Sequence, residues 1–196
     1  MAGNPEAAMA LMMRVWPAAL ARASQELADL QALADAEGTG VAIAPWDWRH
    51  YAEKVRQARY ELDEAQLGPY LQMERLRDAV HWVSGRLFGW TWSEAGEVPT
   101  AHPDVRVYRA QDRDGALVGL WYFDPYARDG KQSGAWMSEY RTQEGFRTQV
   151  RPIVSNNTNY VKPPPGEPTG ISWDDAVTLF HEFGHALHGL SSKVGY

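Results

Sequence analysis

Apolar residues in the first ninety positions recur at intervals of three and four, which is the period of an α-helix. The pattern predicts three helices, over residues 5–37, 47–67 and 73–88. Asn4 followed by Pro5 is a typical helix start, because asparagine caps free N–H groups and proline fits the first turn. Proline in a helix interior removes one hydrogen bond, so Pro17 is expected to kink the first helix or to divide it in two.

The period then changes to the alternation of a β-strand. Residues 105–110 alternate, residues 112–115 (Asp-Arg-Asp-Gly) are a turn signal, and residues 116–123 form a dense apolar run. We therefore expect a β-hairpin. Asp124-Pro125 should end its second strand, because proline donates no hydrogen bond to a neighbouring strand. A further strand is expected at residues 150–155, before a polar run rich in asparagine.

A proline-rich linker precedes the final helix of the chain. Ser172 and Asp175 are spaced as a variant of the capping box, in which each side chain accepts from the other's backbone N–H. Gly184 costs about 1 kcal/mol relative to alanine inside a helix, and its small size would allow another segment or a substrate to approach closely. The many apolar residues of this helix predict burial on several sides. They are Trp173, Ala176, Val177, Phe180, Phe183, Ala186, Leu187 and Leu190.

This last helix contains the sequence His-Glu-x-x-His at residues 181–185. Residues four apart lie one above the other on a helix, about 6 Å along its axis, so the imidazoles of His181 and His185 can close on one metal ion. For zinc, each ligand nitrogen would lie about 2.0–2.1 Å from the ion. Glu182 lies beside them, where a carboxylate can hold and deprotonate the attacking water. The spacing therefore predicts the metal site of a zinc peptidase, with Glu182 as its catalytic residue.

The other histidines have less specific interpretations. Two accidental histidines at 181 and 185 are the alternative to a metal site, and the capped apolar helix makes this alternative less favourable. His188 lies about 10.5 Å along the axis from His181, too far for both to bind one ion, so a supporting or structural role is expected. His188 also departs from the metzincin pattern, which requires glycine at this position. His50 and His81 have no partner at ligand spacing, and surface or core positions are expected for both.

A small sheet directly before a metal-binding helix offers a way to hold a peptide. An extended peptide can add itself to a sheet edge, where main-chain hydrogen bonds bind it whatever its side chains are. Gly134 and Ala135 are the candidates for this substrate-binding edge, because small residues let a peptide backbone approach. An ordinary tight loop before Trp136 explains the same two residues equally well.

The composition and charge of the chain limit the classes of partner. The chain has 196 residues, 44% of them apolar, which is enough for the core of one or two domains. Its net charge of −6 argues against nucleic acid, because phosphate binding requires a basic surface. The apolar run near the N-terminus is interrupted by Arg14 and is too short to span a bilayer, so no membrane partner is expected. The sequence has no cysteine, which is compatible with a reducing compartment, and a cytoplasmic location is expected.

Four blocks of sequence resemble the M3 family of zinc metallopeptidases, the thimet oligopeptidase and peptidyl-dipeptidase group. The block around the metal motif is TLFHEFGHALHGL (residues 178–190). The three upstream blocks resemble the bacterial peptidyl-dipeptidase branch in particular. They are PWDWRHYAEKVRQARYELDEAQLGPYL (residues 45–71), HPDVRVY (residues 102–108) and YARDGKQSGAWM (residues 126–137). Blocks in this order are far more specific than the metal motif alone.

The resemblance implies zinc-dependent hydrolysis of short peptides, by a peptidyl-dipeptidase or an oligopeptidase. It also implies a single zinc ion, held by His181, His185 and a glutamate on a later helix. That third ligand is expected beyond residue 196, so the chain is expected to be an incomplete part of a longer enzyme. A catalytic zinc site uses three protein ligands. The isolated chain should therefore retain zinc weakly and be inactive, unless Glu139 or Glu144 substitutes.

These patterns predict a mainly α protein with a small β-sheet (α+β), a helical zincin-type fragment with its His-Glu-x-x-His helix at the C-terminal end. We expect one partial catalytic domain over residues 1–196. Its parts would be helices at 1–89, a small sheet with loops at 90–165 and the metal-binding helix at 166–196. Two alternatives stay open. One is a non-catalytic helical domain that keeps the motif and binds peptides or a partner. The other is a different zinc enzyme, such as the metal carboxypeptidases, which share only the motif.

Overall fold

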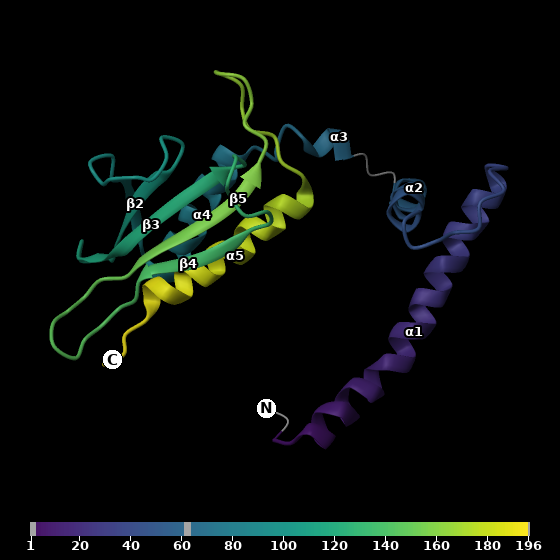
Figure 1. Cartoon of the computed structure of the whole chain (residues 1–196), viewed down its shortest axis with the longest axis horizontal. Helices are drawn as coiled ribbons and strands as arrows, with labels where there is room; N and C mark the ends of the chain where they lie inside the picture. The colour runs from purple at the N-terminus through teal and green to yellow at the C-terminus, as the bar shows by residue number, and fades with distance from the viewer. Residues whose placement is uncertain (1–2, 61–63, 196) are drawn as a thin grey trace. The chain divides into compact units, whose positions relative to one another are not determined.

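The computed structural model describes residues 3–60 and 64–195. The contacts within the chain divide it into two compact units, Met1–Gln66 and Leu67–Tyr196. The fold is α+β, as the sequence predicts, with a five-stranded sheet in the second unit (Figure 1). No helix among the described residues is long and apolar enough to cross a membrane.

The first unit is built from helices. It contains α1 (Pro5–Ala36) and α2 (Trp48–Tyr60), and the short α3 (Glu64–Leu67) lies at its boundary. The side chain of Asn4 caps α1 as predicted, because its Oδ1 accepts the N–H of Ala7 at 2.7 Å. The core between α1 and α2 is small, and its buried residues are Leu30, Ala34 and Tyr51.

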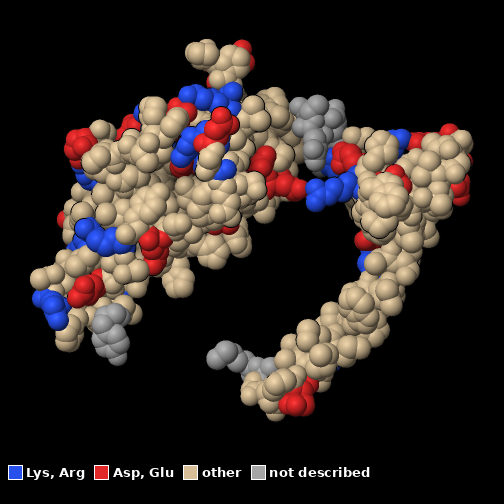
Figure 2. Space-filling view, viewed as in Figure 1, with Lys and Arg blue, Asp and Glu red and all other residues tan. Residues whose placement is uncertain are grey.

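Pro17 lies inside a single continuous α1, so it does not divide the helix, and the kink that was expected as the other outcome stays a prediction. A proline leaves the carbonyl four residues earlier without its helical partner. Both Met13 and Pro17 are exposed, so water can replace the missing N–H donor. This half of α1 is also apolar on its surface, and Figure 2 shows few charged residues along the helix. Its exposed apolar residues are Met9, Leu11, Met12, Met13, Val15, Trp16 and Leu20.

The second unit contains a mixed sheet with the strand order β1-β2-β3-β5-β4. Only β3 and β5 are parallel, and the other neighbouring strands are antiparallel. Strand β4 follows β3 along the chain but lies beyond β5, so it forms an edge of the sheet. The strands are β1 (Thr91–Glu94), β2 (Arg106–Gln111), β3 (Leu117–Tyr126), β4 (Trp136–Arg141) and β5 (Ile153–Tyr160).

The predicted β-hairpin is confirmed, with β2 and β3 as its strands. Asp112 closes the turn, because its carboxylate accepts the N–H groups of Asp114 at 3.0 Å and Ala116 at 2.9 Å. Gly115 has a φ of 78°, in the left-handed region that only glycine adopts without strain. The sequence of the turn therefore sets the pairing of the two strands.

Two strand boundaries differ from the prediction. Strand β3 continues through Asp124 and Pro125 to Tyr126. Its pairing with β5 is irregular between Asp124 and Tyr126, and a residue without an N–H group fits at such a point. Strand β5 begins at Ile153 rather than at residue 150 and includes the polar run 156–159. The polar side chains stay in the strand because other parts of the second unit supply their hydrogen bonds.

Two helices complete the second unit, α4 (Met73–Phe88) and α5 (Trp173–Ser191). Both contact the sheet and each other. A single buried cluster joins them to three strands, and aromatic residues dominate its centre. Its members are Met73, Val80, Tyr108, Trp121, Phe123, Val154, Tyr160, Leu179, Phe183, Ala186 and Leu190. The cluster fixes α5 against the sheet next to the edge strand β4.

Candidate active site

Helix α5 begins where the sequence predicts. Asp175 donates its N–H to the Ser172 hydroxyl at 3.1 Å, and the Asp175 carboxylate accepts the N–H of Ser172 at 3.1 Å, which completes the capping box. One face of the helix is buried against the sheet and α4. The expectation of burial on several sides is wrong for the described residues, because Trp173, Val177 and Phe180 are exposed. The apolar residues of α5 extend over more of its surface than the rest of the unit covers.

The imidazoles of His181 and His185 converge on the exposed side of α5. Their Nε2 atoms are 3.1 Å apart, and their ring planes meet at 82°. Two nitrogens at zinc-ligand distance in a tetrahedral arrangement are about 3.3 Å apart. The pair of nitrogens therefore fits one zinc ion without rearrangement of the helix. Both rings are open to solvent, so an ion can reach them.

A contact from the sheet holds the turn of α5 that carries Glu182. The side-chain amide of Asn156, on β5, donates to the Glu182 carbonyl at 2.7 Å. The carbonyl oxygen of the same side chain accepts from the Trp121 indole N–H at 2.7 Å. Asn156 is fully buried, and its bond to Trp121 forms away from water, whereas its bond to Glu182 is partly buried. The amide thus connects the sheet to the turn of α5 that carries the metal motif.

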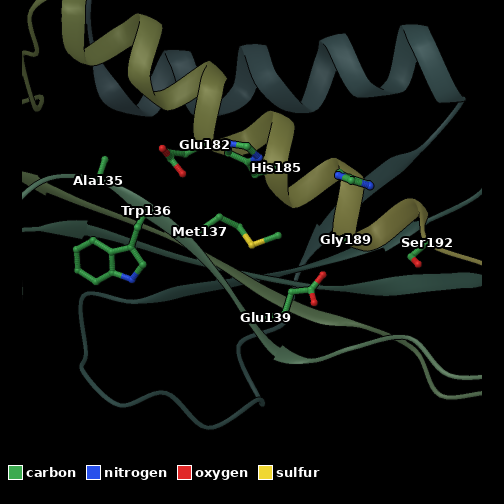
Figure 3. Close-up of a pocket in the computed structure, with 9 residues that line it drawn as sticks. Ala135, Trp136, Met137, Glu139, Glu182, His185, Gly189 and Ser192 are labelled. Carbon is green, nitrogen blue, oxygen red and sulfur yellow. The ribbon is translucent and has the colours of Figure 1, made fainter. Parts of the chain in front are cut away.

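A cavity of about 450 Å³ lies between α5 and the edge strand β4 (Figure 3). Glu182 and His185 face it from the helix. Met137 on β4 and Ala135, directly before β4, face it from the other side. The other residues that line it are Trp136, Glu139, His188, Gly189 and Ser192. Helix and strand come close at Gly189, because a Cβ atom there would lie only 2.7 Å from the Glu139 carboxylate and 3.0 Å from Val154.

The two predicted substrate-binding residues differ in position. Ala135 lines the cavity beside Glu182, directly before β4. Gly134 is not among the lining residues, and its carbonyl accepts a hydrogen bond from Asn159 at 2.7 Å. Its φ of 87° places it in the left-handed region, where glycine is favoured. Gly134 therefore shapes the chain before the edge strand, whereas Ala135 reaches the cavity.

The remaining candidates do not complete a metal site in the part of the chain that the structure describes. Within residues 3–60 and 64–195, no group of three His, Cys, Asp or Glu side chains is placed to hold one ion. Glu139 and His188 line the cavity without joining His181 and His185 in such a group. Glu144 lies in a bridge with Val150, on the loop between β4 and β5.

Sequence reasoning misses several polar residues around the site. The sequence pattern places Asn156 after the end of a strand, whereas the residue is buried inside β5. The pattern also predicts no strand at residues 136–141, where β4 lies, although it does place Ala135 at a sheet edge. One signal for them is present in the sequence, namely the polar run at residues 156–159 directly after an apolar segment. A polar run that continues a buried strand indicates amides with fixed hydrogen-bond partners.

Comparison with known proteins finds similarity to peptidases along the chain. The model of Peptidase family M3 matches residues 1–196. Dipeptidyl carboxypeptidase of Escherichia coli (strain K12) is 45% identical over 197 residues, which cover 100% of this chain and 29% of that protein. Oligopeptidase A of the same organism is 34% identical and covers 99% of this chain and 29% of its own length. An organellar oligopeptidase A of Arabidopsis thaliana is 33% identical, over 96% of this chain and 25% of its own length.

The match extends along nearly the whole chain but only along part of each relative. The chain spans 29% of the length of the two Escherichia coli proteins. The similarity therefore includes the helices, the sheet and α5 together, and it does not rest on the His-Glu-x-x-His motif alone.

Proposed function

Because this chain belongs to peptidase family M3, we propose that it supplies the zinc-binding and water-activating residues of an enzyme that hydrolyses short peptides. The observation that carries the proposal is the convergence of the two Nε2 atoms of His181 and His185, 3.1 Å apart. Glu182 and His185 line the same cavity. The names of the relatives, a dipeptidyl carboxypeptidase and an oligopeptidase, support peptides as the substrate class.

Each residue has a separate role in the proposed reaction. His181 and His185 would hold the zinc ion, and a third ligand is expected outside residues 1–196. A bound zinc ion would supply Lewis acidity toward the peptide carbonyl and toward water. Glu182 would accept the proton of the attacking water and then deliver it to the leaving amine. The main chain at Ala135 would align the peptide with the edge of β4. The reaction is proposed to take place in the cytoplasm.

The stronger of the two similarities favours one mode of cleavage. Identity is 45% with the dipeptidyl carboxypeptidase and 34% with the oligopeptidase A. We therefore propose release of dipeptides from the C-terminal end of the substrate. Mass spectrometry of the products from a peptide of about ten residues separates the two modes. Successive losses of two residues are expected, and internal cuts as the first products would overturn this assignment.

The role of Glu182 is tested by Glu182→Gln in the full-length protein. The change keeps the size of the side chain and removes its proton acceptor, so kcat should fall by about 10³-fold or more. The zinc content should stay at that of the wild type, because the imidazoles are unchanged. Peptide cleavage and metal analysis of the same preparation check both expectations. Glu144→Gln is the matched control, because Glu144 does not line the cavity.

The result also separates the proposal from a non-catalytic peptide-binding domain. Full activity of the Glu182→Gln variant would refute the role of Glu182. A wild-type protein that binds peptides without cleaving them, with zinc bound, would favour the binding domain instead.

A further inference from the structure

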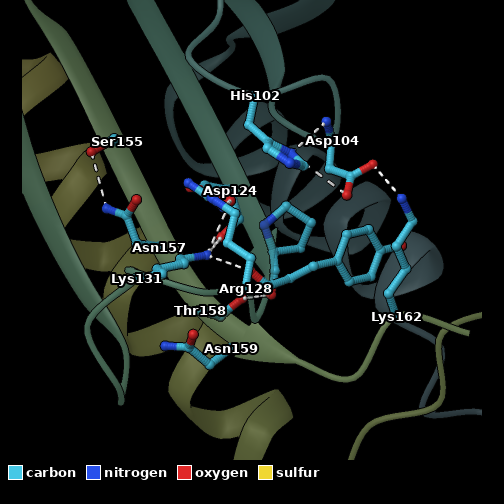
Figure 4. A network of polar contacts seen from close by, with 12 residues as sticks. His102, Asp104, Asp124, Arg128, Lys131, Ser155, Asn157, Thr158, Asn159 and Lys162 are labelled. Atoms are coloured by element: carbon cyan, nitrogen blue, oxygen red, sulfur yellow. Dashed lines mark hydrogen bonds and ion pairs between the residues drawn. The ribbon is translucent and has the colours of Figure 1, made fainter.

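The segment between β3 and β4, residues 127–135, leads directly to the proposed peptide-binding edge. Ala135 is its last residue and lines the cavity with Glu182 and His185. The segment has few apolar residues of its own, and its shape depends on polar contacts (Figure 4). These contacts come from two directions, from a buried lysine within the segment and from an asparagine on β5.

Lys131 is the buried lysine, and its side chain is only 4% exposed. Its ammonium group donates to the main-chain carbonyls of Asp124 at 2.9 Å and Tyr126 at 2.8 Å. The same group is 3.0 Å from the Asp124 carboxylate. All three contacts connect the middle of the segment to the end of β3. A lysine is seldom buried unless its charge is paired, so a fully bonded one indicates a fixed arrangement.

Asp124 is shared by two cations. Arg128 contacts both carboxylate oxygens, each at 2.7 Å, and Lys131 is the second partner. Burial alone would raise the pKa of Asp124, but the hydrogen bonds from Arg128 and Lys131 outweigh it and lower the pKa. The carboxylate therefore remains charged at neutral pH and holds the start of the segment.

Asn159 holds the other end of the segment. It lies on β5, and its side-chain amide donates to the carbonyls of Gln132 at 2.8 Å and Gly134 at 2.7 Å. Both carbonyls lie shortly before the edge strand. Lys131 thus anchors the segment to β3, and Asn159 anchors it to β5, the neighbouring strand of the sheet.

We propose that Lys131 and Asn159 are positioning residues, which fix residues 127–135 so that the main chain at Ala135 and β4 can bind a peptide beside Glu182. The inference rests on the proposed function. A peptide held by main-chain hydrogen bonds needs its template strand at one fixed place relative to the reacting groups. Without these anchors the segment would have to become ordered each time a peptide binds, so loose anchoring would weaken peptide binding.

Asn159→Asp is the first test. The change keeps the shape of the side chain but replaces the N–H donor with an acceptor, which repels both carbonyls. KM for peptides with several residues before the scissile bond should rise about tenfold, from the loss of two hydrogen bonds that hold the edge. The value of kcat and the zinc content should stay within about twofold of the wild type. Gln132→Ala is the control, because Gln132 offers only its main-chain carbonyl to Asn159.

Lys131→Met is the second test, in the same full-length protein. It removes the ammonium and keeps the length of the side chain, so KM should rise as in Asn159→Asp. Lys162→Met is the matched control, because Lys162 bonds Asp104 and donates no hydrogen bond to the segment. Hydrogen exchange at residues 127–137 should accelerate in both test variants and in neither control, while α5 keeps its protection.

The outcomes separate this inference from the proposed function. Peptide cleavage by the wild type tests the proposed function alone. Unchanged KM and unchanged exchange in Asn159→Asp would overturn the positioning role, even with an active wild type. Loss of zinc in that variant, or a fall in kcat at constant KM, would overturn it too, because the defect would then lie at the metal or in the chemical step. Faster exchange at residues 127–137 together with the higher KM would support it.

Discussion

The buried amide of Asn156 shows at the scale of one residue how the sheet supports the candidate site. It bonds the Trp121 indole and the Glu182 carbonyl at the same time. In Asn156→Leu both partners would lose a hydrogen bond, and the indole N–H would stay buried without an acceptor. The free energy of unfolding should fall by about 2–3 kcal/mol. Urea unfolding measures this loss.

A second substitution isolates the bond to the indole. Trp121→Phe removes the N–H donor, and it should cost less in the Asn156→Leu background than in the wild type, because the bond is already absent there. Strictly additive losses would mean that this hydrogen bond does not contribute to stability.

His81 predicts a specific dependence of stability on pH. Its ring stacks on Trp92 at 4.7 Å, and its Nε2 atom is buried without a hydrogen-bond partner among the described residues. Burial, and then the charge of Arg77, lowers the pKa of His81 from 6.5 to about 4. The unfolded chain therefore binds a proton between pH 6.5 and 4 that the folded chain does not. Stability should be complete above pH 6.5 and should fall as the pH is lowered toward 4, by about 2–3 kcal/mol.

The measurement compares unfolding free energies of the wild type and His81→Phe at several pH values. The variant keeps an aromatic ring but cannot take up a proton, so its loss of stability between pH 6.5 and 4 should be smaller than that of the wild type. Equal losses in the two proteins would assign the pH dependence to other groups.

At this scale the sequence predicts some site residues and misses others. His181, Glu182 and His185 are recognisable because their spacing along one helix already determines their geometry. Asn156, Lys131 and Asn159 act through contacts that only the folded chain brings together, and no local spacing marks them. The residues expected to perform the chemistry can be read from the chain, whereas their supporting contacts require the fold.

Helix α5 contains two glycines with opposite expected effects on stability. A Cβ atom added at Gly184 would have open space around it, so alanine there fits without displacement of a neighbour. At Gly189 the same atom would meet Glu139 at 2.7 Å, Val154 at 3.0 Å and Met137 at 3.2 Å. Gly184→Ala should raise the free energy of unfolding by about 0.5–1 kcal/mol. Gly189→Ala should lower it by about 1–3 kcal/mol, because the side chains of Glu139 and Met137 and the stiff side chain of Val154 would have to shift.

Thermal unfolding of the two variants, each against the wild type, checks the sign of each effect. Both substitutions raise helix propensity equally. The difference between their changes in unfolding free energy therefore reports the packing of α5 on the sheet at Gly189. Equal stabilisation by both would show that helix and strand are not in close contact at Gly189.

The elements are predictable to different degrees. Helices and the β2–β3 hairpin follow from periodicity and from the Asp112–Gly115 turn, which are local signals. Strand β4 escapes prediction because its sequence lacks alternation, and it is a strand only through its pairing with β5. The sequence pattern ends β5 before its polar residues, because a buried asparagine is stable only when the rest of the fold supplies partners.

At the scale of the whole chain, the zinc affinity of residues 1–196 is the decisive quantity. Two imidazoles without a third protein ligand should bind zinc weakly, since a catalytic site uses three. Isothermal titration should give a dissociation constant in the micromolar range or weaker, and His181→Ala should weaken it further. One-to-one binding in the nanomolar range would contradict the expectation of a ligand outside this chain. It would direct attention to Glu139, which lines the cavity.

The contacts of the chain divide it after Gln66, and α4 belongs to the same compact unit as the sheet and α5. The sequence could not show this grouping, because the change from helical to strand period near residue 90 does not coincide with a change in packing. The expected three-part layout of a partial catalytic domain stays a prediction.

The strand order has a consequence for synthesis on the ribosome. Strand β4 is made before β5 but pairs only with β5 in this sheet, so its residues have no place to dock when they emerge. The cavity wall formed by Ala135 and Met137 can assemble only after Ile153–Tyr160 have been translated. A nascent chain that ends before β5 would have no template for a peptide. It would also expose an unpaired strand that can pair wrongly with other chains.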